Sequence, residues 1–299
     1  MKIVFIVGPT GTGKSNLAIN LASKINGEII SCDSMQIYKS MDIGTAKVSK
    51  EEQEKAKHHL IDVANPTDNF DVSTYQKYAE SIIQKLFLEN KTPIFAGGTG
   101  LYVNSIIYPM SFSSNERNEK LREELKEYYL ENGASALHKK LELLDKESAD
   151  KLHENDVKRV IRAIEIALSG EKKSDLDEMK KPKYDCVMVG LNTDRELLYE
   201  RINKRVDLMF EAGLEDEVRN LVNCGVGFDC QSMQAIGYKE FKGYFDGEIN
   251  LEELKELIKK NSRNYAKRQI TWFKKYENIK WFDVSELDKA TDYIINNID

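Results

Sequence analysis

An apolar segment, Ile3–Val7, runs directly into residues 8–15, which read Gly8-Pro9-Thr10-Gly11-Thr12-Gly13-Lys14-Ser15. This stretch fills every position of the P-loop pattern G-x-x-x-x-G-K-[ST], and residues with helical spacing follow it. The glycines let successive backbone N–H groups point inward at phosphate oxygens, and the following helix N-terminus adds partial positive charge. We therefore predict that the whole stretch binds a phosphorylated ligand, with Lys14 on the terminal phosphate oxygens and Ser15 on Mg²⁺.

The segments around this loop alternate between short apolar strands and amphipathic helices. Strands are expected at Ile3–Val7, Glu28–Cys32, Pro93–Ala96, Cys186–Leu191 and Ile279–Val284. Helices are expected at Lys14–Ile25, Ser73–Glu89, Arg195–Phe210 and Leu251–Phe273. Ser73 and Gln76 have the spacing of a capping box at the start of the second helix. The alternation predicts an α/β fold of the P-loop NTPase-like class, with a parallel sheet and helices on both of its faces.

The texture changes between residues 115 and 181, which are charged, poor in Gly and Pro, and strongly helical. Apolar residues recur there at helical spacing, in the sets Leu121-Leu125, Leu137-Leu141-Leu144 and Val157-Ile161-Ile164-Leu168. A chain of 299 residues that is 41% apolar has room for one large domain with a second one inserted. We predict a helical insertion domain at residues 115–185, within a core made of residues 1–114 and 186–299.

Composition limits the cellular context. The first residues lack the basic, apolar and small-residue pattern of a signal peptide, and no apolar run approaches ~20 residues. The four cysteines form no CxxC pair and have no zinc-like spacing, and the neighbouring His58 and His59 are expected to be structural. These features favour a cytoplasmic protein with reduced thiols and without a membrane span, and nothing in them requires more than a monomer.

The charge is unevenly distributed. The net charge of −6 argues weakly against a nucleic-acid partner. Between Lys255 and Lys280, however, nine basic residues and two acidic ones give a local net charge of +7. Local patches of charge, rather than the net charge of the whole chain, govern nucleic-acid binding. This basic segment is therefore compatible with an RNA partner.

A P-loop does not by itself name a reaction. No Asp in the chain has Gly three residues later and no N-K-x-D occurs, so the sequence disfavours a GTPase and leaves small-molecule kinases and group transferases. Asp33 follows the strand Glu28–Cys32, at the sheet edge where open α/β proteins bind ligands. From its position alone, Asp33 is either a Mg²⁺ ligand or a general base near the phosphates.

Further blocks carry a resemblance to a known family. They are residues 33–38 (DSMQIY), 41–47 (MDIGTAK), 58–62 (HHLID), 97–102 (GGTGLY), 158–165 (KRVIRAIE), 234–239 (QAIGYK) and 266–273 (AKRQITWF). Together with the P-loop, they span residues 8–273 in one order. This combination resembles the bacterial form of the tRNA dimethylallyltransferases, also called tRNA isopentenyltransferases, and is far more specific than the P-loop alone.

The resemblance implies a reaction and its partners. A dimethylallyl group would pass from dimethylallyl diphosphate to the N6 amine of the adenosine 3′ of the anticodon, in tRNAs that read codons beginning with U. Diphosphate would be released, and the P-loop would hold the diphosphate of the donor rather than hydrolyse ATP. Mg²⁺ would be the cofactor, and the anticodon stem-loop the RNA partner.

The resemblance also assigns roles to residues. Asp33 would be the general base that takes the amine proton, and Thr99 would contact the target adenosine close to it. Arg201 and Arg205 are four residues apart and so share a helix face, and one of them, Arg205 in preference, would clamp the diphosphate.

Contacts to tRNA are carried over by the same resemblance. The residues concerned are Asp33, Ser34, Met35, Gln36, Thr99, Arg122, Lys158, Arg159, Val160, Ile161, Arg162, Gln234, Ala235, Ile236, Gly237, Tyr238 and Lys239. Lys158, Arg159 and Arg162 lie on one predicted helix, so contacts from that helix to the RNA backbone are plausible. Trp272 and Phe273 are expected in the core rather than as stacking platforms for bases.

Other functions remain in competition. An adenylate isopentenyltransferase would use the same donor with AMP as acceptor, but it would not need the helical insertion or the basic segment. A nucleotide or metabolite kinase would explain the P-loop and Asp33, but not residues 33–38 or 97–102. A non-catalytic RNA-binding protein would have no use for Asp33.

Overall fold

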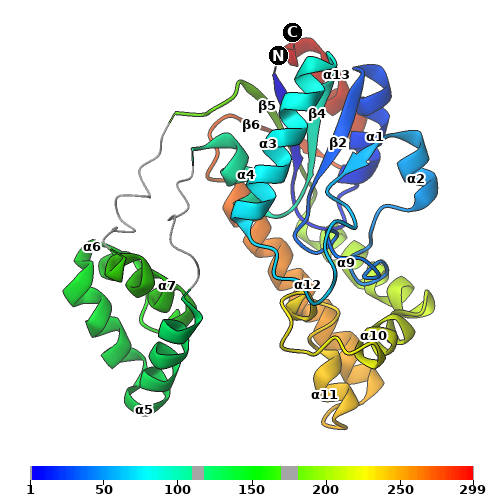
Figure 1. The fold of residues 1–299 in the computed structure, drawn as a ribbon. Helices are drawn as coiled ribbons and strands as arrows, with labels where there is room; N and C mark the ends of the chain where they lie inside the picture. Colours follow the sequence, from blue (N-terminus) through cyan, green and yellow to red (C-terminus); the bar gives the residue numbers. More distant parts are fainter. Residues whose placement is uncertain (1, 110–117, 170–180, 299) are drawn as a thin grey trace. The chain divides into compact units, whose positions relative to one another are not determined.

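The computed structural model describes residues 2–109, 118–169 and 181–298. The chain divides into two compact units, one made of Met1–Ile107 with Lys183–Asp299 and the other of Tyr108–Pro182 (Figure 1). The expected boundary between residues 114 and 115 falls outside the described residues, and the second unit ends at Pro182, close to the expected 185.

The first unit is built on a sheet that contains six parallel strands within the described ranges. They are β1 (Ile3–Val7), β2 (Gly27–Cys32), β3 (His58–His59), β4 (Thr92–Gly97), β5 (Cys186–Asn192) and β6 (Ile279–Asp283), in the order β3-β2-β4-β1-β5-β6. β1 lies between β4 and β5, with Val7 paired to Gly97 on one side and Gly190 on the other. The parallel α/β fold predicted from the sequence is confirmed, and the short edge strand β3 adds to it.

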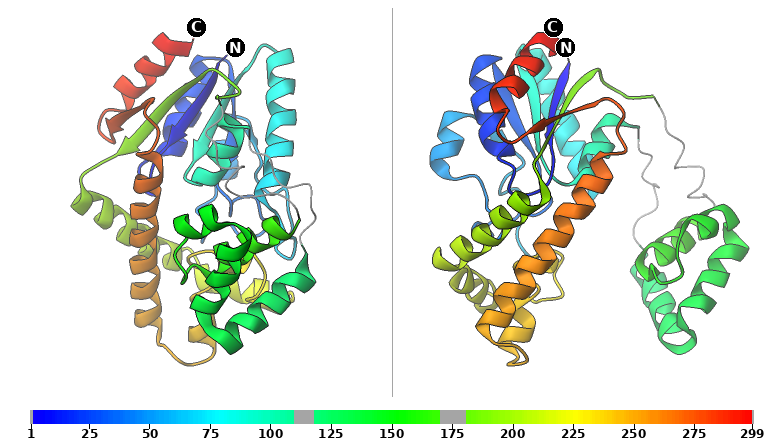
Figure 2. Two further views of the ribbon diagram at one scale, coloured as in Figure 1. Left: turned by 90° about the vertical axis from the view of Figure 1, so that its left-hand side faces the viewer. Right: turned by 180° about the vertical axis from the view of Figure 1, so that it is seen from behind.

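Helices cover both faces of this sheet, as expected. On one face α1 (Lys14–Lys24) and α13 (Leu287–Ile298) pack on alternate residues of β1, β4 and β5, such as Val4, Ile94 and Val189. On the other face lie α3 (Val72–Leu88) and α4 (Gly100–Ile107), which are in front of the strands in Figure 1 and behind them in the right-hand view of Figure 2. Successive side chains of β1 point to opposite faces of the sheet and so belong to two apolar cores, one under each layer of helices.

The remaining elements of this unit lie mainly beyond the carboxyl ends of the strands (Figure 1). They are α2 (Lys50–Lys55), α9 (Arg195–Glu211), α10 (Leu214–Asn223), the 3₁₀ turn η1 (Ser232–Gln234), α11 (Phe241–Phe245) and α12 (Leu251–Phe273). α9 and α12 pack together through Leu198, Ile202 and Ala266. These two long helices thereby form a wall opposite the P-loop. None of the helices in the described ranges is both long and apolar enough to cross a bilayer.

The predicted cap of α3 is wrong. The helix begins at Val72, and the carboxylate of Asp71 accepts a hydrogen bond from Thr74 N at 2.8 Å. Asp71 takes this position from Ser73 because a negative charge suits the positive end of a helix better than a hydroxyl does. Gln76, the expected second partner, is buried and donates to Ser105 O at 2.7 Å instead.

The second unit is helical and has its own core. α5 (Glu119–Leu144), α6 (Lys146–Lys151) and α7 (Val157–Leu168) pack around Leu125, Leu137, Leu141, Ala149, Val160, Ile161, Ala163 and Ile164. α5 is kinked at Gly133, whose φ of 81° only glycine adopts readily. The apolar stripes noted in the sequence turn toward this core except at their last positions, where Leu144 is 38% exposed and Leu168 is 54% exposed at the ends of their helices.

Candidate active site

A cavity of about 360 Å³ opens at the carboxyl ends of β1, β2 and β4. The segments that follow these three strands supply Thr10, Lys14, Ser15, Asp33, Ser34, Met35, Gln36, Ala96, Gly97 and Gly98. α9 and α12 supply the opposite wall, and residues 44–46, 234–237 and 239 complete the lining. The cavity therefore lies at the edge of the sheet where the sequence predicted a ligand site.

The P-loop wraps as its sequence requires. Gly8, Gly11 and Gly13 have φ values of 141°, 84° and 80°, a region of backbone space that favours glycine. A Cβ atom on Gly8 would lie 2.3 Å from the carbonyl oxygen of Leu191, so the loop also needs glycine there to pass β5. The loop thus has the wrapped backbone by which P-loops hold phosphate.

Lys14 is the cation that this loop brings to the cavity. Its Nζ donates a hydrogen bond to Pro9 O at 2.6 Å. Burial first, and then the guanidinium of Arg205, lower the pKa of Lys14 to about 7, against the opposing effect of the Asp33 carboxylate. A bound anion would supply the negative charge that favours the protonated amine.

Asp33 lines the same cavity as Lys14, at the end of β2 where the sequence placed it. Its Oδ1 accepts a hydrogen bond from Met35 N at 2.9 Å, while its own N–H donates to Ser31 Oγ at 3.3 Å. These local contacts fix the residue after β2 and leave the carboxylate among the groups that line the cavity. Thr99 supports the same turn, because its Oγ1 accepts from Ser34 N at 3.1 Å.

The two predicted arginines are placed differently. Arg205 lines the cavity, and its Nη2 donates to Thr45 O at 3.4 Å. Burial lowers the pKa of Arg205, and the nearby Asp33 carboxylate opposes this effect. Arg201 is exposed and lies one helical turn away, beside Gly11. It is absent from the cavity lining in the part of the chain that the structure describes.

Two residues of α12 join the site without having been predicted. Gln269 is buried, its Oε1 accepts from Thr10 N at 3.0 Å, and its Nε2 donates to Gly98 O at 3.1 Å. The hydroxyl of Tyr265 forms hydrogen bonds with the side chains of Thr99 and Gln269, and burial together with Asp33 raises its pKa to about 12. Gln269 belongs to the block 266–273 that carried the family resemblance, but that block by itself gave the residue no role.

One part of the cavity is apolar. Ile202, Val206 and Met209 of α9 line it together with Ile258 of α12. Met209 is 9% exposed and the other three are nearly fully buried. Phosphate-binding groups and an apolar surface thus share one cavity, which suits an amphipathic ligand with a charged end and a hydrocarbon end.

Most of the predicted RNA-contacting residues of the first unit line the same cavity. They are Asp33, Ser34, Met35, Gln36, Gln234, Ala235, Ile236, Gly237 and Lys239. Tyr238 differs, because it is fully buried and its hydroxyl donates to Glu217 Oε1 at 2.6 Å. Its phenol therefore serves the packing of this segment.

The predicted contacts of the second unit fall into two groups. Lys158 and Arg159 are exposed, whereas Val160 and Ile161 are buried in the core of that unit. Arg122 donates twice to the buried carboxylate of Glu165, with Nη2 2.7 Å from Oε2, and Arg162 Nη1 lies 2.5 Å from the same oxygen. Glu165 thus orients two of the predicted cations side by side.

The residues expected to be structural are placed as follows. His59 Nε2 lies 2.6 Å from Glu28 Oε2, and His58 Nδ1 lies 2.7 Å from Ala56 O. Both histidines therefore have partners within the protein, in agreement with a structural role. Phe273 is fully buried, in agreement with the prediction. Trp272 is only half-buried and packs against Gly100, where a Cβ atom would come within 2.2 Å of its ring.

The oxygen donors of the cavity fit Mg²⁺. Within the described ranges, no three His, Cys, Asp or Glu side chains gather as a metal site. The Ser15 hydroxyl and the Asp33 carboxylate nevertheless line one cavity with Lys14. Mg²⁺ is often held by one or two such protein oxygens together with phosphate oxygens and water, so this small donor set matches its chemistry once a diphosphate is present.

Comparison with known proteins gives one consistent family. The family model described as "IPP transferase" matches residues 36–276. A tRNA dimethylallyltransferase of Caldanaerobacter subterraneus subsp. tengcongensis is 51% identical over 292 residues, covering 96% of this chain and 93% of the relative. One of Clostridioides difficile is 49% identical over 288 residues, with the same coverage.

Solved structures agree. The tRNA isopentenylpyrophosphate transferase of Bacillus halodurans is 42% identical, with a TM-score of 0.74 over 99% of this chain and 96% of that one. A eukaryotic dimethylallyltransferase, described as acting on tRNA, is 29% identical, with a TM-score of 0.83 over 99% of this chain and 80% of that one.

Proposed function

The chain belongs to the IPP transferase family, and we propose that it is a tRNA dimethylallyltransferase. The reaction moves a dimethylallyl group from dimethylallyl diphosphate to the N6 amine of the adenosine 3′ of the anticodon, in tRNAs that read codons beginning with U. The observation that carries this proposal is the cavity in which the P-loop, the carboxylate of Asp33 and an apolar wall meet.

The donor half of the reaction uses the two ends of the cavity. The diphosphate binds the N–H groups of the P-loop together with Lys14 and Arg205, while the five-carbon chain packs on Ile202, Val206 and their neighbours. The allylic C–O bond breaks as diphosphate leaves, and the two cations stabilise the negative charge that develops on it. Mg²⁺, held by Ser15 and the diphosphate oxygens, would supply further neutralisation of that charge.

The acceptor half depends on Asp33. The exocyclic amine of adenine is a weak nucleophile because its lone pair is conjugated with the ring, and it must lose a proton as the new C–N bond forms. Asp33 takes that proton, and Thr99, which itself interacts with Tyr265, holds the turn on which Asp33 and Ser34 lie. A base inside a stacked anticodon loop must first be extruded to reach a cavity of this kind.

The RNA is held by residues outside the chemistry. Gln36, Gln234 and Lys239 line the cavity where the extruded base would enter. In the second unit, Lys158 and Arg159 are exposed cations suited to the RNA backbone. We further propose that the enzyme works as a monomer in the cytoplasm, since one chain supplies this whole lining.

Substitution of Asp33 tests the proposal. Labelled dimethylallyl diphosphate is incubated with the protein and Mg²⁺, in parallel with an anticodon stem-loop RNA that carries three adenosines after the middle base of the anticodon, and with AMP. Asp33→Asn should lower kcat on the RNA by roughly 10²–10⁴-fold through loss of the base. Donor affinity should not weaken, because the change removes a negative charge beside the diphosphate.

Asp216→Asn is the matched control, because Asp216 is exposed on α10 and the same charge is removed. It should transfer label like the natural sequence. Unchanged transfer by Asp33→Asn would overturn the role given to Asp33. Label on AMP alone would overturn the choice of tRNA as acceptor.

A further inference from the structure

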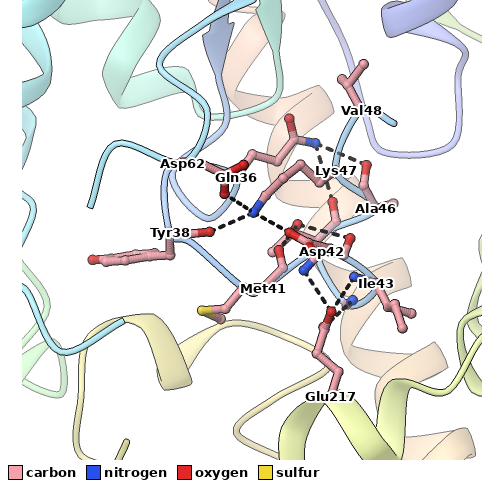
Figure 3. Close-up of polar contacts among 12 residues, drawn as sticks. Gln36, Tyr38, Met41, Asp42, Ile43, Ala46, Lys47, Val48, Asp62 and Glu217 are labelled. Atoms are coloured by element: carbon pink, nitrogen blue, oxygen red, sulfur yellow. Dashed lines mark hydrogen bonds and ion pairs between the residues drawn. The ribbon is translucent and has the colours of Figure 1, made fainter. Parts of the chain in front are cut away.

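A carboxylate outside the cavity collects four hydrogen bonds from two segments that line it. Glu217, on α10, accepts at Oε2 from the N–H groups of Asp42 and Ile43, both at 2.8 Å. At Oε1 it accepts from Gly44 N at 3.1 Å and from the hydroxyl of Tyr238 at 2.6 Å. Figure 3 shows Glu217 rising from its helix toward the turn at residues 42–44. We call this arrangement the Glu217 cradle.

The far side of the same loop is fastened by a buried amine. Lys47 Nζ lies 2.6 Å from both Asp42 Oδ1 and Asp62 Oδ1, and it donates to Tyr38 O at 2.7 Å. The side chain of Lys47 is only 4% exposed (Figure 3). Residues 38–47 are therefore held from within by Lys47 and from α10 by Glu217.

The loop so held shapes the cavity. Gly44, Thr45 and Ala46 are part of its lining. The carbonyl of Thr45 accepts from Arg205 Nη2 at 3.4 Å and from Gln36 Nε2 at 3.4 Å. The position of the loop thus affects a cavity residue on α9 and another in the turn after β2.

The second partner of the cradle leads to the other lining segment. Tyr238 lies between Gly237 and Lys239, which both line the cavity. A Cβ atom on Gly44 would come within 2.4 Å of the Tyr238 ring, so the two segments touch where Glu217 binds them. One carboxylate therefore sets the spacing between residues 42–46 and residues 234–239.

We propose that Glu217 is a positioning residue for the RNA half of the site, which rests on the proposed function above. It holds the two lining segments at the separation that admits the target nucleotide. Glu217 does not itself belong to the cavity lining in the described ranges, and none of its four bonds involves the P-loop. Its loss should therefore disturb RNA use more strongly than donor binding, because the loop meets the proposed diphosphate contacts at Arg205, through the 3.4 Å bond to Thr45 O, and not at the P-loop.

Glu217→Gln is the sharpest variant because it keeps the shape of the side chain. A carboxylate has two acceptor oxygens and suits four donors, whereas an amide has one oxygen and an NH₂ group that is itself a donor. The donors that now bond to one of the two carboxylate oxygens would then face the NH₂ group of the amide, which offers them no acceptor. Tyr238→Phe removes a single donor and serves as the milder variant, should Glu217→Gln reduce the yield of folded protein.

The first readout requires no catalysis. Amide hydrogen exchange, followed by mass spectrometry on peptides covering residues 40–47, should speed up in Glu217→Gln and less so in Tyr238→Phe. Peptides from β1 and α1 should exchange as in the natural sequence. Asp216→Asn is again the matched control, being the neighbouring acid on the same helix, and should change neither region.

The second readout separates the two substrates. We expect kcat/KM for the stem-loop RNA to fall by about 10–100-fold in Glu217→Gln, as small displacements in a site commonly cause. The Kd for dimethylallyl diphosphate should change far less, since the P-loop contacts are untouched and Arg205 meets the loop through a single 3.4 Å bond to Thr45 O. Tyr238→Phe should show the same selective effect at smaller size.

The outcomes are distinct. Faster exchange at residues 42–44 together with an RNA-selective loss supports the proposal. Unchanged exchange there, or equal weakening of donor and RNA, overturns it. A natural-sequence protein that moves no label to RNA would instead refute the proposed function, while the exchange experiment would still report whether the cradle exists.

Discussion

The amine of Lys14 lies in a cavity whose lining, among the described residues, also includes the cations Arg205, Lys239 and Arg268 and the carboxylate of Asp33. Its pKa of about 7 results first from burial, then from Arg205, against the opposing effect of Asp33. An unfolded chain would hold this proton up to its ordinary pKa of 10.5. Because the unfolded chain binds more protons between these two values, the contribution of Lys14 to folding stability becomes more favourable as pH rises through that window.

The same pKa predicts proton uptake when the donor binds. Above pH 7 the free amine is mostly neutral, and the diphosphate should restore its charge. Calorimetry of donor binding in two buffers of different ionisation heat should show uptake of about one proton at pH 8 and far less at pH 6.

Lys14→Arg supplies the control, because a guanidinium stays charged throughout this range. The number of protons taken up when dimethylallyl diphosphate binds Lys14→Arg, measured under the same conditions, gives the contribution of the diphosphate's own ionisation. Equal uptake by Lys14→Arg and the natural sequence at pH 8 would contradict the assignment to Lys14.

Single residues also show where sequence reading reaches its limit. Gly8 to Ser15 and Asp33 could be predicted because their spacing along the chain carries the chemistry. Glu217 and Gln269 could not, because each looks like an ordinary polar helix residue, and its partners at Asp42 and Thr10 are distant in sequence. Such residues are identified by three-dimensional contact alone.

Helix α12 connects two loops of the phosphate site through one side chain. Gln269 contacts Thr10 N in the P-loop and Gly98 O after β4, and a Cβ on Gly98 would come within 2.0 Å of its Nε2. The amide of Gln269 thus sets the distance between the loops that follow β1 and β4. A C-terminal helix is in this way part of the donor site.

Gln269→Leu should therefore weaken donor binding. Removing both hydrogen bonds and leaving the buried groups unpaired costs about 1–3 kcal/mol, or roughly 5–100-fold in Kd. Titration with dimethylallyl diphosphate measures the change. Thr271→Ala, on the exposed side of the same helix, should bind the donor normally. An unaltered Kd in Gln269→Leu would show that the P-loop keeps its geometry without α12.

The larger elements were predicted better than their ends. The five long strands match because each is an apolar run bounded by turns, which is typical of buried parallel strands. β3 was missed because His58 and His59 lack apolar character, and its place in the sheet comes from parallel pairing with Ile29 and Ile30 of β2. The start of α3 was placed wrongly because Asp71 and Ser73 are both good caps, and only the fold selects between them.

On the level of the whole chain, the second unit leaves and re-enters the first at neighbouring points. Lys183 N donates to Ile107 O at 2.7 Å, so the residues on either side of the insertion are already joined by a hydrogen bond. The second unit also packs around its own apolar core. The two points of the first unit between which the second unit is inserted are therefore held together within the first unit itself.

Replacing residues 108–182 with a short Gly-Ser linker should leave the first unit folded. Donor affinity should stay the same, because the cavity lining comes from the first unit alone. Transfer to the stem-loop RNA should fall sharply, because Arg122, Lys158 and Arg159 are removed. Melting curves, donor titration and label transfer measure the three effects. Full transfer by the shortened chain would contradict the RNA-binding role proposed for the second unit.

The bond between Thr10 and Gln269 has a consequence for synthesis of the chain. Its two ends are 259 residues apart, so the P-loop leaves the ribosome long before α12 does. A nascent chain can form the early strands while the amide of Thr10 still lacks its acceptor. The donor site is thus completed only when nearly the whole described chain has emerged, so that incomplete translation products would not sequester the prenyl donor.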